Sequence, residues 1–185
     1  MFSSGGEPGV DQYNPRPAFF YMYYFQKYFG DQMVQDAVSG SSDVLAYAST
    51  FSSGETGMVL VNKGTSAQTT SVALQNFDPG VLYYTMTLTG GTDNGEFSRK
   101  VLLNGVEDPD EEGGGPDHYE SIKAHAFEIE NGITIDLPPR SVVYVLLEDK
   151  APISYVWSKT ETSKSAIDVK FSEEVSFTSR PSCEI

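Results

Sequence analysis

The most hydrophobic stretch of the chain is the segment 17–31, PAFFYMYYFQKYFGD. Phe, Tyr and Met side chains crowd into about three helical turns and lie on nearly every side, which is typical of a helix that is covered all round. We expect this helix to run over 17–29, with Asn14 as its N-cap, Pro15 in its first turn and Gly30 as a left-handed C-cap. Because large aromatic side chains dominate burial energetics, the rest of the chain has to supply their cover.

From residue 43 the hydrophobic period changes from helical spacing to two, which indicates strands separated by turns. Asn131-Gly132 is a strong type I′ signal and predicts a hairpin between the two strands that flank it. A short helical turn is expected within 119–126. The predicted strands are 44–51, 57–62, 69–74, 81–88, 100–103, 127–129, 133–137 and 141–147. This spacing predicts a mainly β fold, an antiparallel β-sandwich with one N-terminal aromatic helix.

The pattern divides the chain into three parts. Residues 1–42 read as a loop, the helix and a polar linker, 43–149 as the sandwich domain, and 150–185 as a tail with strands at 153–157 and 166–171. Two strands are too few to fold alone. The tail is therefore either an extension docked on the sandwich or the opening of a truncated second domain.

The amino-acid composition and net charge argue against two classes of binding partner. The 185 residues carry a formal net charge of -14 with a pI near 4.3, which argues against nucleic acid and against an anionic membrane surface. Residues 1–5 lack the basic and apolar regions of a signal peptide, and no apolar run reaches spanning length. The single cysteine, Cys183, excludes a disulfide within the chain.

The acidic residues offer candidate chemistry, mostly in loops. The carboxylates considered for a hydrolytic pair are Glu7, Asp11, Asp93, Glu96, Asp117 and Glu120. A pair needs a fixed separation and one raised pKa, which favours the interpretation that these are solvated side chains. A calcium ion is the candidate cofactor, with Asp108, Asp110 and Asp117 as ligands, because hard cations take clustered carboxylate oxygens; a solvated charge run is the alternative.

Three aromatic residues are candidates for stacking on sugar rings: Tyr119, Trp157 and Tyr84. Tyr119 comes first, because it follows the turn at 115–117 and is the least core-like. In a sandwich most aromatic residues at alternating positions face the core, which is the competing interpretation for all three. The irregular segment 90–116 is the longest in the chain, and loops of this length are usually functional or disordered.

The order of parts resembles the C-terminal end of retaining glycoside hydrolases, in which a (β/α)8 barrel is followed by a β-sandwich. The segments that carry the resemblance are the aromatic helix ending FGD, the strand AYASTF, the hairpin to MVLVN, the strand YYTMTLTG and the closing PPRSVVYVLLE. The tail segment AIDVKFSEEVSF is similar to the first strands of bacterial immunoglobulin-like modules in secreted polysaccharide-degrading enzymes.

The resemblance implies a secreted, non-catalytic accessory region that supports a barrel and contacts polysaccharide. Both catalytic glutamates would precede Met1, so the chain would not be active alone, and the loop 3–15 would lie at the catalytic face. The helix 17–29 would lie between barrel and sandwich. With the barrel absent, we expect self-association through Phe20 and Tyr24.

A free-standing carbohydrate-binding module and a structural or adhesion module are the alternative functions. A binding module would be retarded in a polysaccharide-containing gel without hydrolysis, whereas an adhesion module would show neither effect. An unpaired aromatic helix at the start favours the accessory region.

Overall fold

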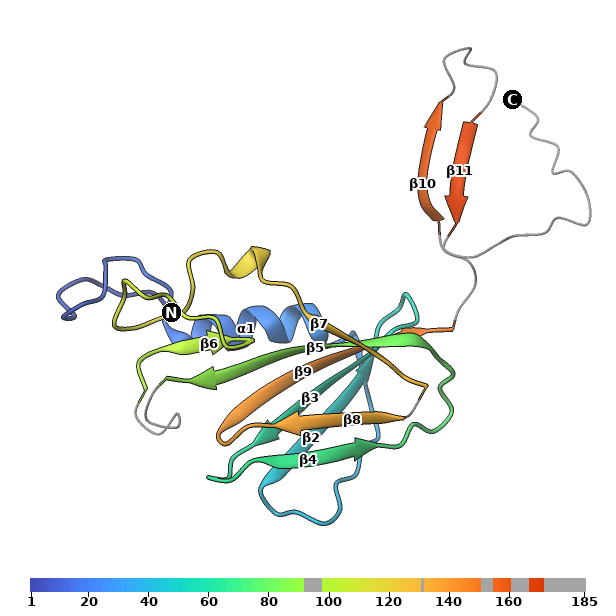
Figure 1. Cartoon of the computed structure of the whole chain (residues 1–185), viewed down its shortest axis with the longest axis horizontal. Coiled ribbons are helices and arrows are strands. Elements are labelled where there is room, and N and C mark those ends of the chain that lie inside the picture. The colour runs from blue at the N-terminus through green and yellow to red at the C-terminus, as the bar shows by residue number, and fades with distance from the viewer. Residues whose placement is uncertain (92–97, 131, 151–154, 161–166, 172–185) are drawn as a thin grey trace, which may run out of the picture. The chain divides into compact units, whose positions relative to one another are not determined.

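The computed structural model describes residues 1–91, 98–130, 132–150, 155–160 and 167–171. The chain divides into two compact units, Met1–Lys150 and Ala151–Ile185, each of which is described by itself (Figure 1). The first unit holds the helix together with the strands of two sheets. The helix is therefore part of the same compact unit as the sandwich.

The main sheet is antiparallel and, in the described part of the first unit, has seven strands in the order β1-β2-β3-β9-β5-β6, with β7 also paired with β5. Its strands are β1 (Gln32–Val34), β2 (Val44–Thr50), β3 (Thr56–Asn62), β5 (Pro79–Gly90), β6 (Val101–Leu103), β7 (His125–Glu128) and β9 (Ser141–Asp149). β9 pairs with β3 on one side, from Asn62↔Ser141 to Thr56↔Leu147, and with β5 on the other. Its apolar sequence fits this central position, because most of its side chains are buried on both faces of the sheet.

A second sheet of two strands, β4 (Gln68–Val72) and β8 (Ile133–Leu137), faces the main sheet. In β8 the apolar side chains are buried and alternate with exposed Thr134 and Asp136, as a strand of period two requires. The buried side chains pack with Val143, Val145 and Leu147 of β9 in one hydrophobic cluster. The predicted fold class, a mainly β antiparallel sandwich with an N-terminal helix, is confirmed.

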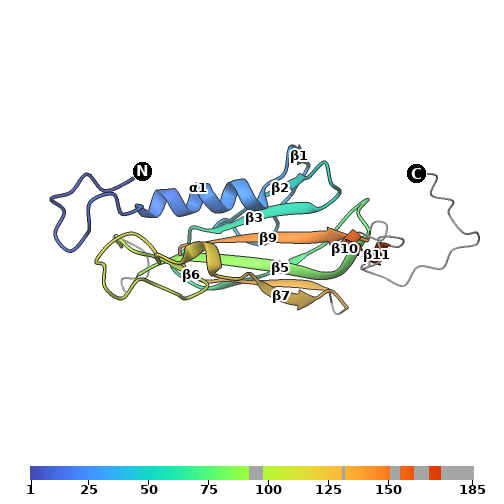
Figure 2. The same cartoon turned by 90° about the horizontal axis from the view of Figure 1, so that it is seen from above.

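Helix α1 (Pro17–Tyr28) lies on the other face of the main sheet, alongside β3 and β9 (Figure 2). A second hydrophobic cluster lies between α1 and the sheet. It contains Phe20 and Tyr24 of the helix, with exposed fractions of 0% and 2%. The hydroxyl of Tyr144 donates to the Tyr21 carbonyl at 2.7 Å, which ties β9 to the helix backbone. A second copy could not reach Phe20 or Tyr24 without separating α1 from the sheet, and self-association stays a prediction.

The two ends of α1 differ from the predicted caps. The N-cap is Arg16 in an extended conformation without a side-chain cap, and Pro17 rather than Pro15 occupies the first turn. Asn14 lies outside the helix and is buried. At the other end Gly30 does not have a positive φ. Its lack of a side chain serves close approach instead, since a Cβ there would lie 2.3 Å from the Thr50 carbonyl oxygen.

Sequence pattern also mispredicted some local connections. The hairpin at Asn131-Gly132 is wrong, because β7 pairs with β5 while β8 pairs with β4 in the other sheet; Asn131 itself lies outside the described residues. The polar linker contains the short edge strand β1, which pairs with β2. The helical turn within 119–126 is present as the 3-10 turn η1 (Tyr119–Ser121).

The described part of the second unit is an antiparallel pair, β10 (Tyr155–Thr160) and β11 (Ile167–Phe171). The register runs from Tyr155↔Phe171 to Thr160↔Ile167 with an irregularity near Trp157. These strands overlap the two ranges predicted for the tail. In the described residues of the whole chain, no helix is long and apolar enough to cross a membrane.

Candidate functional site

The N-terminal segment forms a loop that closes on itself just before α1. Phe2 pairs with Pro15, and the Ser3 amide donates to the Asn14 carbonyl at 2.9 Å. Tyr13 has a φ of 70° and is largely exposed. The closed ends hold residues 4–12 as a projecting loop at the N-terminal end of the helix (Figure 2).

The segment 98–114 supplies the facing wall. Lys100 and Gly114 form a parallel bridge, which folds the segment back on itself. The Glu112 amide donates to the Gly9 carbonyl at 2.7 Å, and the Asp11 amide donates to the Glu111 carboxylate at 3.1 Å. Because these bonds join two segments far apart in the sequence, they fix the position of the N-terminal loop.

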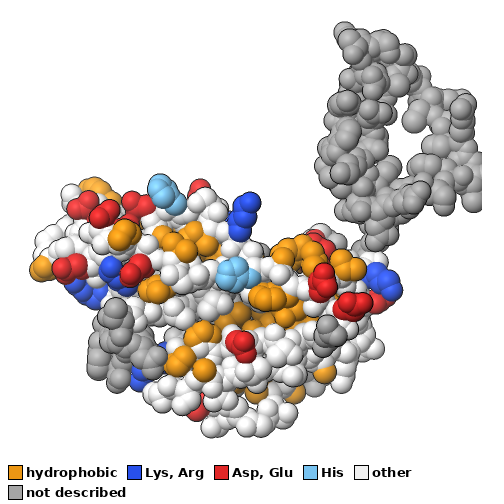
Figure 3. All heavy atoms as spheres, in the orientation of Figure 1, with side chains coloured by type: hydrophobic (Ala, Val, Ile, Leu, Met, Phe, Trp, Pro, Cys, Tyr) orange, Lys and Arg blue, Asp and Glu red, His pale blue; other side chains and the backbone are white. Residues whose placement is uncertain are grey.

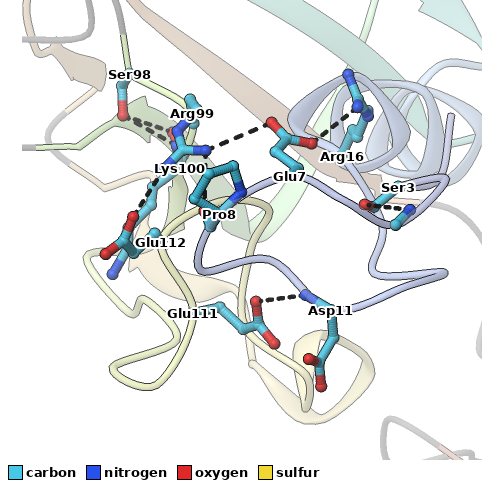
Figure 4. Close-up of polar contacts among 11 residues, drawn as sticks. Ser3, Glu7, Pro8, Asp11, Arg16, Ser98, Arg99, Lys100, Glu111 and Glu112 are labelled. Carbon is cyan, nitrogen blue, oxygen red and sulfur yellow. Dashed lines mark hydrogen bonds and ion pairs between the residues drawn. The ribbon is translucent and has the colours of Figure 1, made fainter.

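Four charged side chains lie where the two segments meet (Figure 4). Glu7 accepts from Arg16 Nη2 at 2.8 Å and lies 3.6 Å from Arg99 Nη1. Arg99 Nη2 also contacts Glu112 at 2.9 Å, and its Nη1 donates to the Pro8 carbonyl at 3.3 Å. Pairs this exposed contribute about 0–1 kcal/mol each to stability. Their main effect is geometric, since they hold donors and acceptors on one surface.

These residues border a pocket of about 170 Å³. It is lined by Glu7, Val10, Pro15, Arg16, Pro17, Ser98, Arg99, Gly113 and Gly114. Ser98 Oγ is already engaged with the amides of Gly91 and Lys100 and with the Lys100 carbonyl. The groups that face a ligand are therefore a carboxylate, two guanidinium groups and apolar walls. This set can bind hydroxyl groups.

Tyr119 packs against the helix in the structure. Its ring meets those of Phe19, Phe20 and Tyr23 edge to face at 5.0–5.6 Å, and its carbonyl accepts from the Tyr24 hydroxyl at 3.0 Å. Burial raises the pKa of Tyr119, with a smaller contribution from Glu120. These contacts explain its position by packing, and sugar binding by Tyr119 stays a prediction.

The other two aromatic candidates have different surroundings. The Tyr84 hydroxyl donates to Glu148 Oε1 at 2.8 Å, and this hydrogen bond is the main cause of a raised pKa of Tyr84. Trp157 lies in β10, where the structure describes the backbone and not the side chain. Glu148, which binds the hydroxyl of Tyr84, is not among the residues that contact Tyr119 in the hydrogen bonds and ring contacts given above.

The carboxylates proposed for calcium are arranged as loop residues. The Asp110 amide donates to Asp108 Oδ1 at 2.9 Å. Among the described residues, Asp108, Asp110 and Asp117 belong to no group of three or more side chains that could hold a metal ion. Of the carboxylates considered for hydrolysis, Asp93 and Glu96 lie outside the described residues, and Glu7 is ion-paired as above.

A second, larger groove of about 550 Å³ lies at the other end of β5. It is lined by Pro79, Gly80, Val81, Leu82, Glu128, Ile129 and Glu130. Figure 3 shows hydrophobic side chains gathered across the face that carries β5, β7 and β8. This groove is mainly apolar with two acidic side chains, so it lacks the mixed donors and acceptors of the smaller pocket.

An exposed apolar surface lies on the helix side of the main sheet. Met22 and Phe25 are 53% and 40% exposed on the side of α1 that faces away from the sheet. Leu45 and Tyr47 of β2 alternate with Val44, Ala46 and Ala48, which pack against the opposite core, so they share the face that carries α1. We call Met22, Phe25, Leu45 and Tyr47 the outer apolar face.

Sequence reasoning missed the two arginines of the pocket. Arg16 and Arg99 are two of only four arginines in a chain of net charge -14, and both adjoin loops rich in Gly and Pro. The small number of arginines in an acidic chain is the sequence signal that could have indicated these two residues. Their meeting point depends on the Lys100–Gly114 bridge, which no local pattern specifies.

No protein-family model matches the chain, and no curated protein matches it significantly. Among solved structures, the arabinose-bound MgGH51 α-L-arabinofuranosidase is similar over 74% of this chain and 20% of its own, with 17% identity and a TM-score of 0.52. CelM2, a bifunctional glucanase-xylanase from a metagenome library, matches over 66% of this chain and 19% of its own, with 18% identity and a TM-score of 0.47.

A glycoside hydrolase family 30 subfamily 8 xylanase from Clostridium acetobutylicum matches over 75% of this chain and 28% of its own, with 18% identity and a TM-score of 0.44. The chain thus matches 19–28% of the length of these structures. At such identities the arabinofuranosidase likeness concerns the fold alone.

Proposed function

We propose that this chain is the C-terminal β-sandwich region of a secreted, polysaccharide-degrading glycoside hydrolase, in which it supports a catalytic barrel. The observation that carries the proposal is the outer apolar face, which is exposed on β2 and on the side of α1 opposite the buried Phe20 and Tyr24. The fold likeness to a part of an α-L-arabinofuranosidase supports it.

The physical argument rests on the two sides of α1. One side packs on β3 and β9, whereas the other exposes Met22 and Phe25, and β2 exposes Leu45 and Tyr47 on the same face of the sheet. Several exposed apolar side chains on one face favour an interaction site, because covering them recovers about 25 cal/mol per Å² of apolar area. In the proposed enzyme the barrel is the cover, with α1 as its last helix.

The experiment begins with the coding sequence upstream of Met1, where an in-frame barrel is expected. In the longer protein, Phe25→Asp should lower the melting temperature, since it places a charge in the barrel interface. In the isolated chain the same change should have a smaller effect, about 0.5–1.5 kcal/mol, because Phe25 is 40% exposed there and loses mainly its stacking on Phe29. A stop codon directly upstream, or equal effects in both proteins, would refute the proposal.

Activity measurements separate the remaining classes. We expect the isolated chain to release no reducing sugar from β-glucan, xylan, mannan or agar. Clear turnover would contradict the non-catalytic role. A free-standing binding module would instead be retarded in a polysaccharide gel and would have no barrel upstream.

A further inference from the structure

The pocket of about 170 Å³ between the N-terminal loop and residues 98–114 has a balanced set of charges. Arg16 and Arg99 face Glu7, and Glu112 pairs with Arg99 on its other side. Glu7 and the two guanidinium groups line the pocket, and Glu112, which lies outside the lining, balances the second guanidinium through its ion pair with Arg99. The pocket therefore offers hydrogen-bond donors and acceptors without an excess of either charge.

This balance decides between an anionic and a neutral ligand. An anion between the arginines would meet the carboxylate of Glu7, which lines the same pocket. A hydroxyl group can donate to that carboxylate and accept from a guanidinium N–H, so that every polar group keeps a partner. Hydrogen bonds to charged groups are the stronger class, which favours a ligand that carries several hydroxyl groups.

The ion-pair distances show where such a hydroxyl fits. Arg16 Nη2 is bonded to Glu7 at 2.8 Å, whereas Arg99 Nη1 lies 3.6 Å from it. Glu7 Oε1 and Arg99 Nη1 are therefore not joined by a direct hydrogen bond, and a hydroxyl group placed beside the pair can contact both. The walls formed by Val10, Pro15 and Pro17 are apolar and suit the C–H surface of a ring.

Size and rigidity limit the ligand further. A volume of about 170 Å³ is similar to that of a cavity of about 150 Å³ that takes up one benzene ring, which is room for one sugar ring rather than several. The Glu112–Gly9 and Asp11–Glu111 hydrogen bonds hold the two walls together before a ligand arrives. A pre-formed site loses less free energy to ordering when it binds.

We propose that this pocket binds one neutral pentose or hexose ring, with Glu7 accepting from one hydroxyl and Arg99 donating to another. The choice of sugars as the hydroxyl-rich class rests on the proposed function. The site is separate from Tyr119 and Tyr84, neither of which lines it.

The test is a titration of the ¹⁵N-labelled chain with arabinose, xylose and glucose, followed by amide chemical shifts. Binding in about the millimolar range should move the amides of Val10, Gly113 and Gly114. Glucuronate and inorganic phosphate form the anionic arm and should bind at least about tenfold more weakly than the neutral sugars. The proposal is overturned if the anions bind more tightly, if shifts occur only elsewhere, or if no neutral sugar shifts these amides at about 100 mM.

Variants assign the effect to the pocket. Glu7→Gln and Arg99→Gln should each weaken binding of the best sugar by about fivefold or more, since each replaces a charged partner by a neutral one. Asp78→Asn is the matched control, because it removes the carboxylate of an exposed ion pair with Lys150 that lies outside the pocket. Its affinity should be unchanged.

Melting temperatures of all variants show whether the pocket still folds. If both pocket variants remain folded and bind as well as the wild type, the assignment is wrong. A failure here leaves the accessory role intact, since that role is judged by the upstream barrel and by Phe25→Asp.

Discussion

Replacing Phe20 by Ala tests whether α1 is held by the sheet as the structure describes. The Phe20 side chain is 0% exposed, and its ring meets those of Phe19 and Tyr119 at 5.3 Å. Its far edge lies against Gly115, which has no side chain that could move into a cavity. We therefore expect a cost of about 3–5 kcal/mol, the range for truncating a buried Phe in a site that cannot collapse.

The measurement is urea denaturation followed by far-UV circular dichroism, together with thermal melts. For a unit of this size the change corresponds to a fall in melting temperature of about 6–20 °C. Met22→Ala is the matched control on the same helix, because Met22 is exposed, and should stay within about 0.5 kcal/mol of the wild type. If Phe20→Ala costs less than about 1 kcal/mol, the helix does not pack on the sheet through this ring.

Three further predictions concern other parts of the first unit. Burial is the main cause that raises the pKa of Tyr24 above its ordinary value of 10.0, so the stability it contributes is full below pH 10 and is lost as pH rises through the folded pKa. Tyr24→Phe should thus lose less stability than the wild type between about pH 8 and pH 11 in urea titrations, and an equal loss would contradict this. Asn62→Ala should cost roughly 2–4 kcal/mol in thermal melts, since the buried amide of Asn62 lies 2.8–3.1 Å from three carbonyl oxygens; a change under about 0.5 kcal/mol would refute it. Gly57→Ala should lower the melting temperature by an amount equivalent to about 1–3 kcal/mol, because its Cβ would lie 1.9 Å from the Tyr28 carbonyl oxygen, and an unchanged melting curve would count against that contact.

Much of the fold follows from periodicity, whereas pairing between distant strands does not. The aromatic density of residues 17–29 and the period of two in 44–62 identify α1, β2 and β3 directly. The signal at Asn131-Gly132 misleads because a local pattern describes a turn and not the partner of the strand that follows. β8 instead buries Ile133, Ile135 and Leu137 beside β4, a strand much earlier in the chain.

Local sequence pattern predicts the pocket even less well than it predicts the pairing of distant strands. The sequence identifies Glu7 as a loop carboxylate, but its partner Arg99 lies far along the chain, in a segment that only the tertiary fold brings next to the N-terminal loop. Helix ends were misassigned for a related reason, since Arg16 caps by backbone conformation and Gly30 is required by contact with Thr50. Tertiary contacts, which a single sequence does not display, decide these details.

The central position of β9 sets an order of events during synthesis. Asn62 of β3 is translated roughly 80 residues before Ser141, its partner in β9, an interval of about 4–16 s on the ribosome. β5 also pairs with β9, which is synthesised after it. The inner edges of β3 and β5 therefore have no native partner until the last strand of the unit emerges, and the native sheet is completed when β9 inserts between them. Chaperone dependence and aggregation during translation should concentrate in that interval.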